Sequence, residues 1–298
     1  MYKEKFIQHL RNEKNYSSHT EISYFRDIAQ FEEFIEKETG EKCDPTTVDR
    51  DQIRIWISTL MSEGIKSRSV NRKLSAIRSF FKYLQKINVI AKNPALAVTG
   101  PKVDKEIPSF VSHKDLTRIL DDDSCFSDDF EGQRDRFLIE LLYVTGMRRA
   151  EITKLKDIDI DKSSKTIRVL GKRNKERLIP LSDRTLEKVN DYLTIRNEKV
   201  ENKSPFLFVK KDGNPIYPNM IYNIVNRYLE GIQTLAKKSP HILRHSFATE
   251  MLNNGAEITA VKEILGHSSL SSTEVYTHVT FEELKKAYQH AHPRADKL

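Results

Sequence analysis

Residues 240–280 read PHILRHSFATEMLNNGAEITAVKEILGHSSLSSTEVYTHVT, and the rest of the chain is organised around this stretch. Pro240 suits the first turn of a helix, because an N–H at that position would have no partner within the helix. On that helix His241 and Arg244 are three residues apart and share one face. Leu243 points roughly the opposite way, so a core on that side can hold the helix in place.

A second helix is predicted over 258–265, because Gly266 directly after it is a natural residue for ending a helix. His267 follows at once, on the turn. Ser271, or the serine after it, suits the cap of a third helix that carries Tyr276. The stretch therefore presents an arginine, two histidines and a tyrosine from three short helices joined by tight turns.

These side chains suit chemistry on a phosphate. Arginine binds phosphate oxygens as a fork, histidine moves protons near neutral pH, and tyrosine offers a hydroxyl nucleophile that needs activation. No carboxylate cluster stands beside them to hold Mg²⁺, so we expect neither a metal nor another cofactor. One alternative is zinc bound by His241 and His245, although Ile242 stands where the zinc-protease motif has glutamate. Taken singly, each residue is more often an ordinary surface side chain.

The composition is that of a soluble protein that can bind a polyanion. The 298 residues suffice for two domains, and the net charge is +7 with a pI of about 9.1. No apolar run approaches the length of a membrane span, and no apolar signal region follows the charged start at Met1. Cys43 and Cys125 lie far apart without metal-ligand spacing, so we expect a reduced, cytoplasmic protein.

The first 92 residues or so are predicted to be helical, with helices over 20–37, 51–61 and 69–85. In the last helix, a basic face runs opposite an apolar stripe that contains Val70, Leu74, Ile77, Phe81 and Leu84. No acidic residue occurs between Glu63 and Asp104, which favours contact with nucleic-acid phosphates over a merely solvated face. The expected contact residues are Arg68, Arg72, Lys73, Arg78, Lys82 and Lys86.

Residues 93–110 are the best candidate for a linker, because they contain three prolines and show little periodicity. Such a segment is long enough to let two domains lie on opposite sides of a rod as wide as a DNA duplex. We therefore divide the chain into a helical, DNA-binding domain with its linker over 1–104 and a second domain over 105–298.

The second domain is predicted to mix helices with a few short strands. Helices are expected over 112–120, 134–144, 183–199 and 218–231, and strands over 158–160, 166–170 and 177–181. Arg148 follows a glycine turn at a helix start, where an anion can bind, whereas Arg149 beside it suits an exposed salt bridge equally well. The turn 171–176 is expected to bring its basic residues into a groove of a duplex or to form a solvated hairpin tip, and these residues are Lys172, Arg173 and Lys175.

Five motifs resemble the active-site motifs of the tyrosine recombinase (phage integrase) family, in that family's order and spacing. They are Thr145-Gly-Met-Arg148, Gly171-Lys-Arg-Asn-Lys-Glu-Arg177, His241-Ile-Leu-Arg244-His-Ser-Phe-Ala-Thr, Leu265-Gly-His267-Ser-Ser and Tyr276-Thr-His. The resemblance covers nearly the whole chain and is strongest to the bacterial Xer subgroup, which shares its length, domain plan and His292-Pro-Arg-Ala ending. Two residues depart from the common pattern, Arg149 in place of an aliphatic residue and Arg173 in place of glycine, and neither removes a catalytic group.

The resemblance implies a mainly α fold. It consists of an N-terminal four-helix SAM-like core-binding domain and an α+β catalytic domain with a small three-stranded antiparallel sheet. It also implies that the protein is a recombinase in which Tyr276 attacks a DNA phosphodiester and forms a 3′-phosphotyrosyl link. The implied catalytic set is Arg148 and Arg244 as phosphate clamps, His267 as a further donor, His241 as a base and Lys172 as general acid.

By the same resemblance, two strand exchanges through a Holliday junction give recombination without ATP or metal, most simply in chromosome dimer resolution. The alternatives are a mobile-element integrase or invertase, a DNA-relaxing enzyme and a catalytically silent DNA-binding relative. The implied partners are a duplex recombination site, further protomers in a homo- or hetero-tetramer, a paralogous recombinase and a division-associated DNA translocase. The amphipathic helix 281–290 is expected to dock on a neighbouring protomer, the alternative being its own domain.

Overall fold

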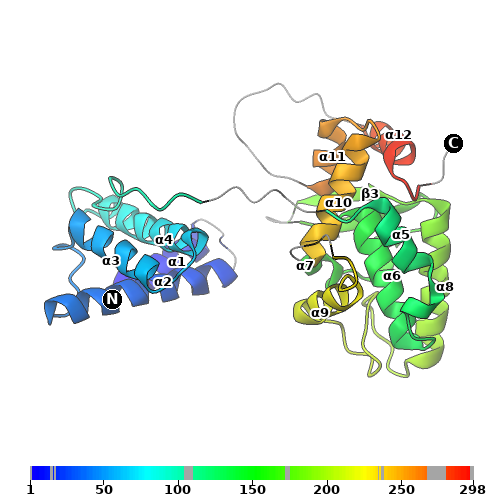
Figure 1. Cartoon of the computed structure of the whole chain (residues 1–298), viewed down its shortest axis with the longest axis horizontal. Helices are drawn as coiled ribbons and strands as arrows, with labels where there is room; N and C mark the ends of the chain where they lie inside the picture. The colour runs from blue at the N-terminus through cyan, green and yellow to red at the C-terminus, as the bar shows by residue number, and fades with distance from the viewer. Residues whose placement is uncertain are drawn as a thin grey trace. The chain divides into compact units, whose positions relative to one another are not determined.

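A computed structural model of the chain describes residues 2–13, 16, 18–103, 110–171, 175–233, 235, 238–266 and 280–295. The chain divides into two compact units, Met1–Glu106 and Ile107–Leu298, whose helices and strands are labelled in Figure 1. Among the described helices, none is long and apolar enough to cross a membrane.

The N-terminal unit is a bundle of helices around one apolar core, as the sequence predicts. The three helices expected over 20–37, 51–61 and 69–85 are confirmed, each to within two residues at either end. A further helix at the N-terminus buries Phe6 and Leu10 in the same core. The elements of this unit are α1 (Tyr2–Asn12), α2 (Ser18–Thr39), α3 (Arg50–Ser62) and α4 (Ser67–Lys86).

α4 has the two faces that its sequence pattern predicts. The residues of the apolar stripe, from Val70 to Leu84, are buried in the core. On the opposite side, Arg68, Arg72 and Lys82 are exposed. α4 therefore holds its basic face toward solvent because its other face is fixed in the core.

The C-terminal unit is α+β and contains a small antiparallel sheet of order β1-β2-β3, which confirms the predicted fold class. Ile167 pairs with Ile160 on one side and with Ile179 on the other. The strands are β1 (Ile160–Asp161), β2 (Thr166–Leu170) and β3 (Glu176–Pro180). The first strand is shorter than expected, because residues Asp157–Asp159 form a 3-10 helix, η2, that leads into it.

Helices surround this sheet and one central helix, α6 (Phe130–Thr145), of which 13 of 16 residues are buried. α6 packs against α8 and α10 (Figure 1). The remaining elements are α5 (His113–Asp121), η1 (Asp123–Cys125), α7 (Arg149–Ile152), α8 (Asp183–Lys199), α9 (Pro218–Tyr228), α10 (Pro240–Asn253), α11 (Ile258–Leu265) and α12 (Phe281–Ala291). All helices predicted in this domain within the described ranges are present. The predicted third helix, which carries Tyr276, lies outside those ranges.

α12 packs on its own domain in the single chain. Its Leu284 and Tyr288 are buried in the same core as α10 and α11, and Figure 1 shows these three helices together. The sequence favoured docking on a neighbouring protomer. The single chain shows the alternative, in which the helix packs on its own domain. The apolar face that made α12 a candidate for a neighbour is covered here by α10, α11 and β3.

The segment after α12 also packs against the rest of the domain. Arg294 forms a buried ion pair with Glu140 on α6 and a partly exposed one with Asp121 at the end of α5. His292 is enclosed by the rings of Tyr143, Phe247 and Tyr288, and burial lowers its pKa to about 3. His292 is therefore neutral at physiological pH, and the His-Pro-Arg-Ala ending is part of the core of the C-terminal unit.

Candidate active site

Three arginines from distant parts of the sequence converge on the C-terminal end of α11. Arg177 donates to the carbonyl of Ile264 at 2.7 Å, and Arg244 donates to the carbonyl of Leu265 at 2.7 Å. Arg148 donates to the carbonyl of Gly266 at 3.2 Å. The last carbonyls of a helix lack partners within it and carry the negative end of its dipole, so they attract cations. The end of α11 therefore gathers positive charge at one place.

A glycine turn brings Arg148 close to Arg244 on α10. α6 ends at Gly146, which has a left-handed backbone with φ of 59°. A Cβ at Gly146 would lie 2.7 Å from Leu265 and 2.8 Å from Phe247, so only glycine fits where α6, α10 and α11 meet. The carbonyl of Gly146 accepts a hydrogen bond from Arg244 at 2.6 Å, two residues before Arg148. Thus the Thr-Gly-Met-Arg motif and the His-x-x-Arg motif form one site.

Arg244 is buried beneath this site, with 8% of its surface exposed. Burial, followed by repulsion from Arg148, lowers its pKa to about 10. A guanidinium with that pKa is still charged at neutral pH. Arg148 is half-buried at the N-terminus of α7, so the pair places a buried and a more accessible cation together. Two guanidinium groups placed in this way suit an anionic group with two free oxygens.

Glu151 is a residue of this candidate site that sequence reasoning missed. Its carboxylate accepts from Arg148 at 3.0 Å and from both terminal nitrogens of Arg177, at 3.0 and 2.8 Å. Burial alone would raise the pKa of Glu151, but the hydrogen bonds from Arg177 and Arg148 outweigh burial and hold the pKa below its usual value. In the described part of the chain, Glu151 is the only carboxylate that pairs with any of these arginines.

A sequence signal for Glu151 did exist. It stands three residues after Arg148, at the third position of α7, and its side chain accepts from the Arg148 backbone N–H at 2.7 Å. A glutamate at that position of a helix commonly closes a capping box. That pattern predicts local contact with Arg148, whereas the contact with Arg177 depends on tertiary structure.

His241 lies on the first turn of α10, one turn from Arg244, as predicted. Its pKa is lowered, first by partial burial and then by the positive charges of Arg149, Arg244 and Arg148. A neutral imidazole at physiological pH can accept a proton, which a base must do. Arg149 is thus a neighbour of the site, and its charge acts on His241.

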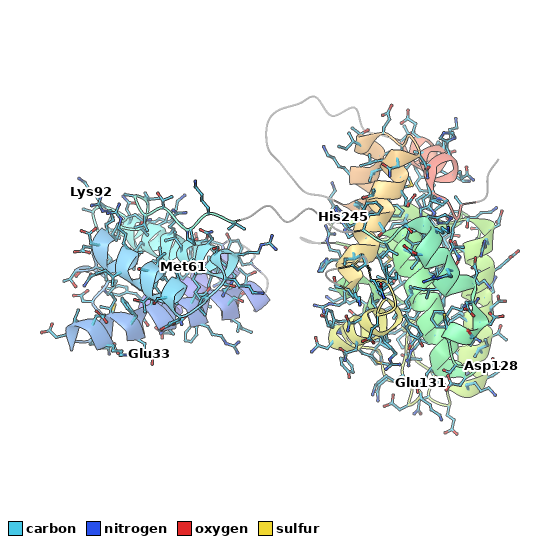
Figure 2. The ribbon with its side chains drawn as sticks, in the orientation of Figure 1. Glu33, Met61, Lys92, Asp128, Glu131 and His245 are labelled. Atoms are coloured by element: carbon cyan, nitrogen blue, oxygen red, sulfur yellow. The ribbon has the colours of Figure 1, made fainter. Side chains whose placement is uncertain are left out.

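Zinc bound by His241 and His245 would need a further ligand, and the residues that the structure describes supply none. His245 is exposed on α10, as Figure 2 shows, and His241 is exposed one turn before it. No group of three histidine, cysteine, aspartate or glutamate side chains with metal-binding geometry occurs within the described ranges. A helical pair of histidines without further ligands is a weak zinc site.

Three predicted catalytic residues, Lys172, His267 and Tyr276, lie outside the described ranges, as does Arg173. The residues at the edge of these segments are described. Gly171 donates to the carbonyl of Lys175 at 2.8 Å, which closes the base of the turn that contains Lys172. Gly266 ends α11 in a left-handed conformation, with φ of 62°, directly before His267.

Five of the six predicted DNA-contacting residues of α4 fall into two groups, and the sixth, Lys86, pairs with Glu13. Arg72 and Lys73 both pair with Asp27 on α2, and Arg78 donates to two main-chain carbonyls, one of them at Ala95. These three side chains therefore have partners inside the domain. In the described ranges, Arg68 and Lys82 have no ion pair, and both are exposed, as is Lys175 in the second domain.

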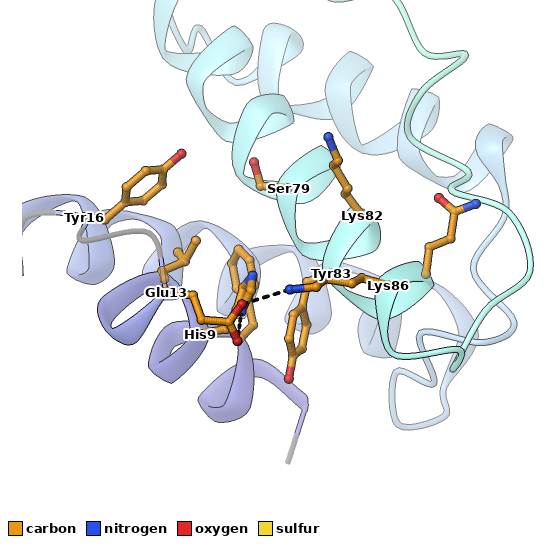
Figure 3. Close-up of a pocket in the computed structure, with 10 residues that line it drawn as sticks. His9, Glu13, Tyr16, Ser79, Lys82, Tyr83 and Lys86 are labelled. Atoms are coloured by element: carbon orange, nitrogen blue, oxygen red, sulfur yellow. Dashed lines mark hydrogen bonds and ion pairs between the residues drawn. The ribbon is translucent and has the colours of Figure 1, made fainter.

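A pocket of about 510 Å³ lies beside the basic face, between α1 and α4 (Figure 3). Glu13 crosses it, paired with Lys86 at 2.8 Å and with His9 at 3.0 Å. Lys82 lines the same pocket. The acidic partners that the sequence of α4 lacks are thus supplied by other segments, Glu13 for Lys86 and Asp27 for Arg72.

Two family models match the chain. The phage integrase family matches residues 109–283, and the N-terminal SAM-like domain of phage integrases matches residues 4–87. Together they cover both units of the structure, including each described member of the predicted catalytic set.

Curated relatives match over nearly the full length. Tyrosine recombinase XerC of Chlorobaculum tepidum is 36% identical, over 98% of this chain and 94% of the relative. Tyrosine recombinase XerC of Bacillus licheniformis is 38% identical, over 98% of this chain and 96% of the relative.

Solved structures share the fold. The Tn1549 transposon integrase in complex with circular intermediate DNA matches with a TM-score of 0.70 and 20% identity, over 96% of this chain and 98% of that chain. The XerH recombinase in its post-cleavage complex with a palindromic difH substrate matches with a TM-score of 0.71 and 22% identity, over 97% and 81% of the two chains.

Proposed function

Because the chain belongs to the phage integrase family of tyrosine recombinases, we propose that its three-arginine site binds the scissile phosphate of a DNA recombination site. The chain is a site-specific recombinase, an enzyme that cuts and rejoins DNA. One observation carries the proposal for the site. Arg148 and Arg244 are held together at the end of α11, beside the neutral His241 and directly before His267 in sequence.

The proposed reaction is an attack on phosphorus by the Tyr276 hydroxyl. The phenolic oxygen forms a 3′-phosphotyrosyl bond, the bond to the 5′ oxygen breaks, and His241 takes the phenolic proton. Lys172 gives a proton to the departing 5′ oxygen. Arg148, Arg244 and His267 stabilise the charge that grows on the non-bridging oxygens. A 5′ hydroxyl of the partner strand reverses these steps and releases Tyr276.

We assign the biological role to chromosome dimer resolution, because the curated relatives that span the chain are XerC recombinases. The partners in this role are a duplex recombination site, protomers in a tetramer, a paralogous recombinase and a division-associated translocase. The N-terminal region 1–104 serves as the DNA-binding domain and 105–298 as the catalytic domain, and a cytoplasmic location fits this function. In the tetramer, α12 is proposed to dock on a neighbouring protomer.

The role is tested by mapping where the protein becomes covalently attached to the chromosome. A dimer-resolving recombinase is expected to be captured at a single chromosomal site shared by strains with and without mobile elements. Capture only at the ends of an integrated element would instead identify an integrase with the same chemistry. Binding at sites without any covalent capture would identify a silent DNA-binding relative.

Lys82→Ala is expected to weaken DNA binding about equally for all sequences. Each phosphate contact releases counterions, so its loss lowers the slope of log affinity against log salt concentration by about one unit. Arg68→Ala is expected to behave in the same way, because both side chains are exposed on α4. The measurement is a salt titration of DNA affinity.

Arg54→Ala is the matched control for these variants. Arg54 is also exposed, but it lies on α3, where it pairs with Asp51 at 3.3 Å, and it is not part of α4. Its removal is expected to leave the salt slope unchanged. If Lys82→Ala and Arg68→Ala keep the parent slope as well, the basic face of α4 is only a solvated surface.

A further inference from the structure

Arg177 is a buried guanidinium to which the proposed chemistry gives no role. It lies on β3, and 9% of its surface is exposed. Its Nε donates to the carbonyl of Ile264 at 2.7 Å, while its two terminal nitrogens bind the two oxygens of Glu151. Burying an arginine costs desolvation, which such a complete set of partners offsets. These contacts join β3 to Glu151 on α7 and to the end of α11.

Arg177 packs beneath the ends of two segments that carry catalytic residues. A Cβ at Gly266 would lie 3.0 Å from Cδ and 3.3 Å from Nε of Arg177. A Cβ at Gly171 would lie 3.8 Å from a terminal nitrogen of the same side chain. Gly266 directly precedes His267, and Gly171 directly precedes Lys172. One side chain therefore lies close to both glycines, and it binds the end of α11 directly through the carbonyl of Ile264.

The contact with Glu151 extends to Arg148. Glu151 Oε1 accepts from Arg148 Nη1 and from Arg177 Nη1, each at 3.0 Å. The two-fold pairing with Arg177 engages both oxygens of Glu151, so the Arg148 guanidinium keeps a single contact, through Oε1. Without Arg177, the carboxylate of Glu151 keeps only Arg148 as a partner, through its backbone N–H and its guanidinium, and can pair with that guanidinium more closely. That pairing would compete with a phosphate for the same nitrogens.

We propose that Arg177 is a positioning residue that keeps the Arg148 guanidinium oriented toward the scissile phosphate, by holding both Glu151 and the carbonyl end of α11. It acts through Arg148 and does not itself touch DNA. This inference rests on the proposed role of Arg148 as a phosphate clamp. Supporting residues of this kind matter because small displacements of an active-site group have large effects on rate.

The first test is Arg177→Met, which keeps most of the side-chain length and removes every donor. At saturating DNA, formation of the covalent adduct on a nicked duplex should slow by about 10²-fold, as for an active-site misplacement of about 1 Å. DNA affinity should stay within about twofold, because the binding surface is unchanged. Arg177→Lys should be intermediate, since a lysine can reach Glu151 as a point charge but lacks the fork.

Arg196→Met is the matched control for damage to the fold. Arg196 is also buried and binds both oxygens of Asp157, as well as the carbonyls of Phe206 and Leu207. Arg196→Met should lower thermal stability as much as Arg177→Met does. Its adduct rate per folded molecule should equal that of the parent. If the two variants lose adduct rate equally, Arg177 is merely structural and the inference is overturned.

A double-mutant cycle with Glu151→Gln tests the route through Glu151. The neutral glutamine no longer attracts the Arg148 guanidinium by its charge. Adding Arg177→Met to this variant should therefore lower the adduct rate much less than it does in the parent. Fully additive losses would contradict the proposed route. A bridging 5′ sulfur at the scissile phosphate should not rescue Arg177→Met, because sulfur replaces the need for a general acid only. Rescue by sulfur would show that Arg177 positions Lys172 instead.

Failure of the inference and failure of the proposed site can be told apart. If Arg148→Ala forms the adduct normally, the phosphate clamp itself is wrong. If Arg148→Ala is inactive while Arg177→Met reacts at the parent rate, the clamp holds and only the role of Arg177 is wrong.

Discussion

Replacing the Tyr276 hydroxyl by hydrogen, in Tyr276→Phe, is expected to abolish the covalent protein–DNA adduct and leave DNA affinity unchanged. The substitution removes a single oxygen, the atom proposed to attack phosphorus. The groups proposed to bind the phosphate in the ground state, Arg148 and Arg244, remain at the end of α11. The measurement is adduct formation on a nicked duplex that loses the leaving strand, together with a binding titration.

Tyr222→Phe is the control for this experiment. Tyr222 is an exposed tyrosine of the same domain, on α9, and its hydroxyl has no proposed part in the reaction. It should form the adduct at the parent rate. Residual adduct from Tyr276→Phe, at a rate comparable with that of Tyr222→Phe, would require another nucleophile and would end the assignment.

Much of the fold could be predicted because its local signals agree with its tertiary structure. α11 begins and ends as predicted, since Gly266 adopts the left-handed conformation that ends a helix. α10 begins at Pro240, and α5 is capped by Ser112. In these helices the apolar stripe, the cap and the stop all indicate the same boundaries. The prediction that His241 and Arg244 share one face of α10 rested on the same helical pattern.

Contacts between distant segments could not be predicted in this way. The basic face of α4 has no acidic residue near it in sequence, yet Asp27 and Glu13 reach it from other segments. The contact between Arg177 and Glu151 spans 26 residues and depends on how β3 packs beside α7. An amphipathic helix such as α12 shows that one of its faces will be covered. The pattern does not show whether its own domain or a neighbour covers it.

The second large effect concerns Lys172 and its proposed role in proton transfer. Lys172→Ala is expected to slow cleavage of ordinary DNA by ~10²–10⁴-fold, the usual cost of losing a general acid. The departing 5′ oxygen is a poor leaving group until it gains a proton. A thiolate is far less basic and leaves without one. On DNA with a bridging 5′ sulfur at the scissile phosphate, Lys172→Ala should therefore cleave almost as fast as the parent.

Arg148→Ala should respond differently to the same substrate. Arg148 is proposed to stabilise charge on the non-bridging oxygens, and this charge develops whichever atom leaves. The expected loss of ~10²–10³-fold, typical of a missing electrostatic donor, should therefore persist with sulfur. Lys162→Ala is the matched control, because Lys162 is an exposed lysine in the other turn of the same sheet, between β1 and β2. It should behave like the parent on both substrates. If sulfur rescues neither Lys172→Ala nor Arg148→Ala, Lys172 binds DNA rather than donating a proton, and Lys175 and His241 become the candidates for the acid.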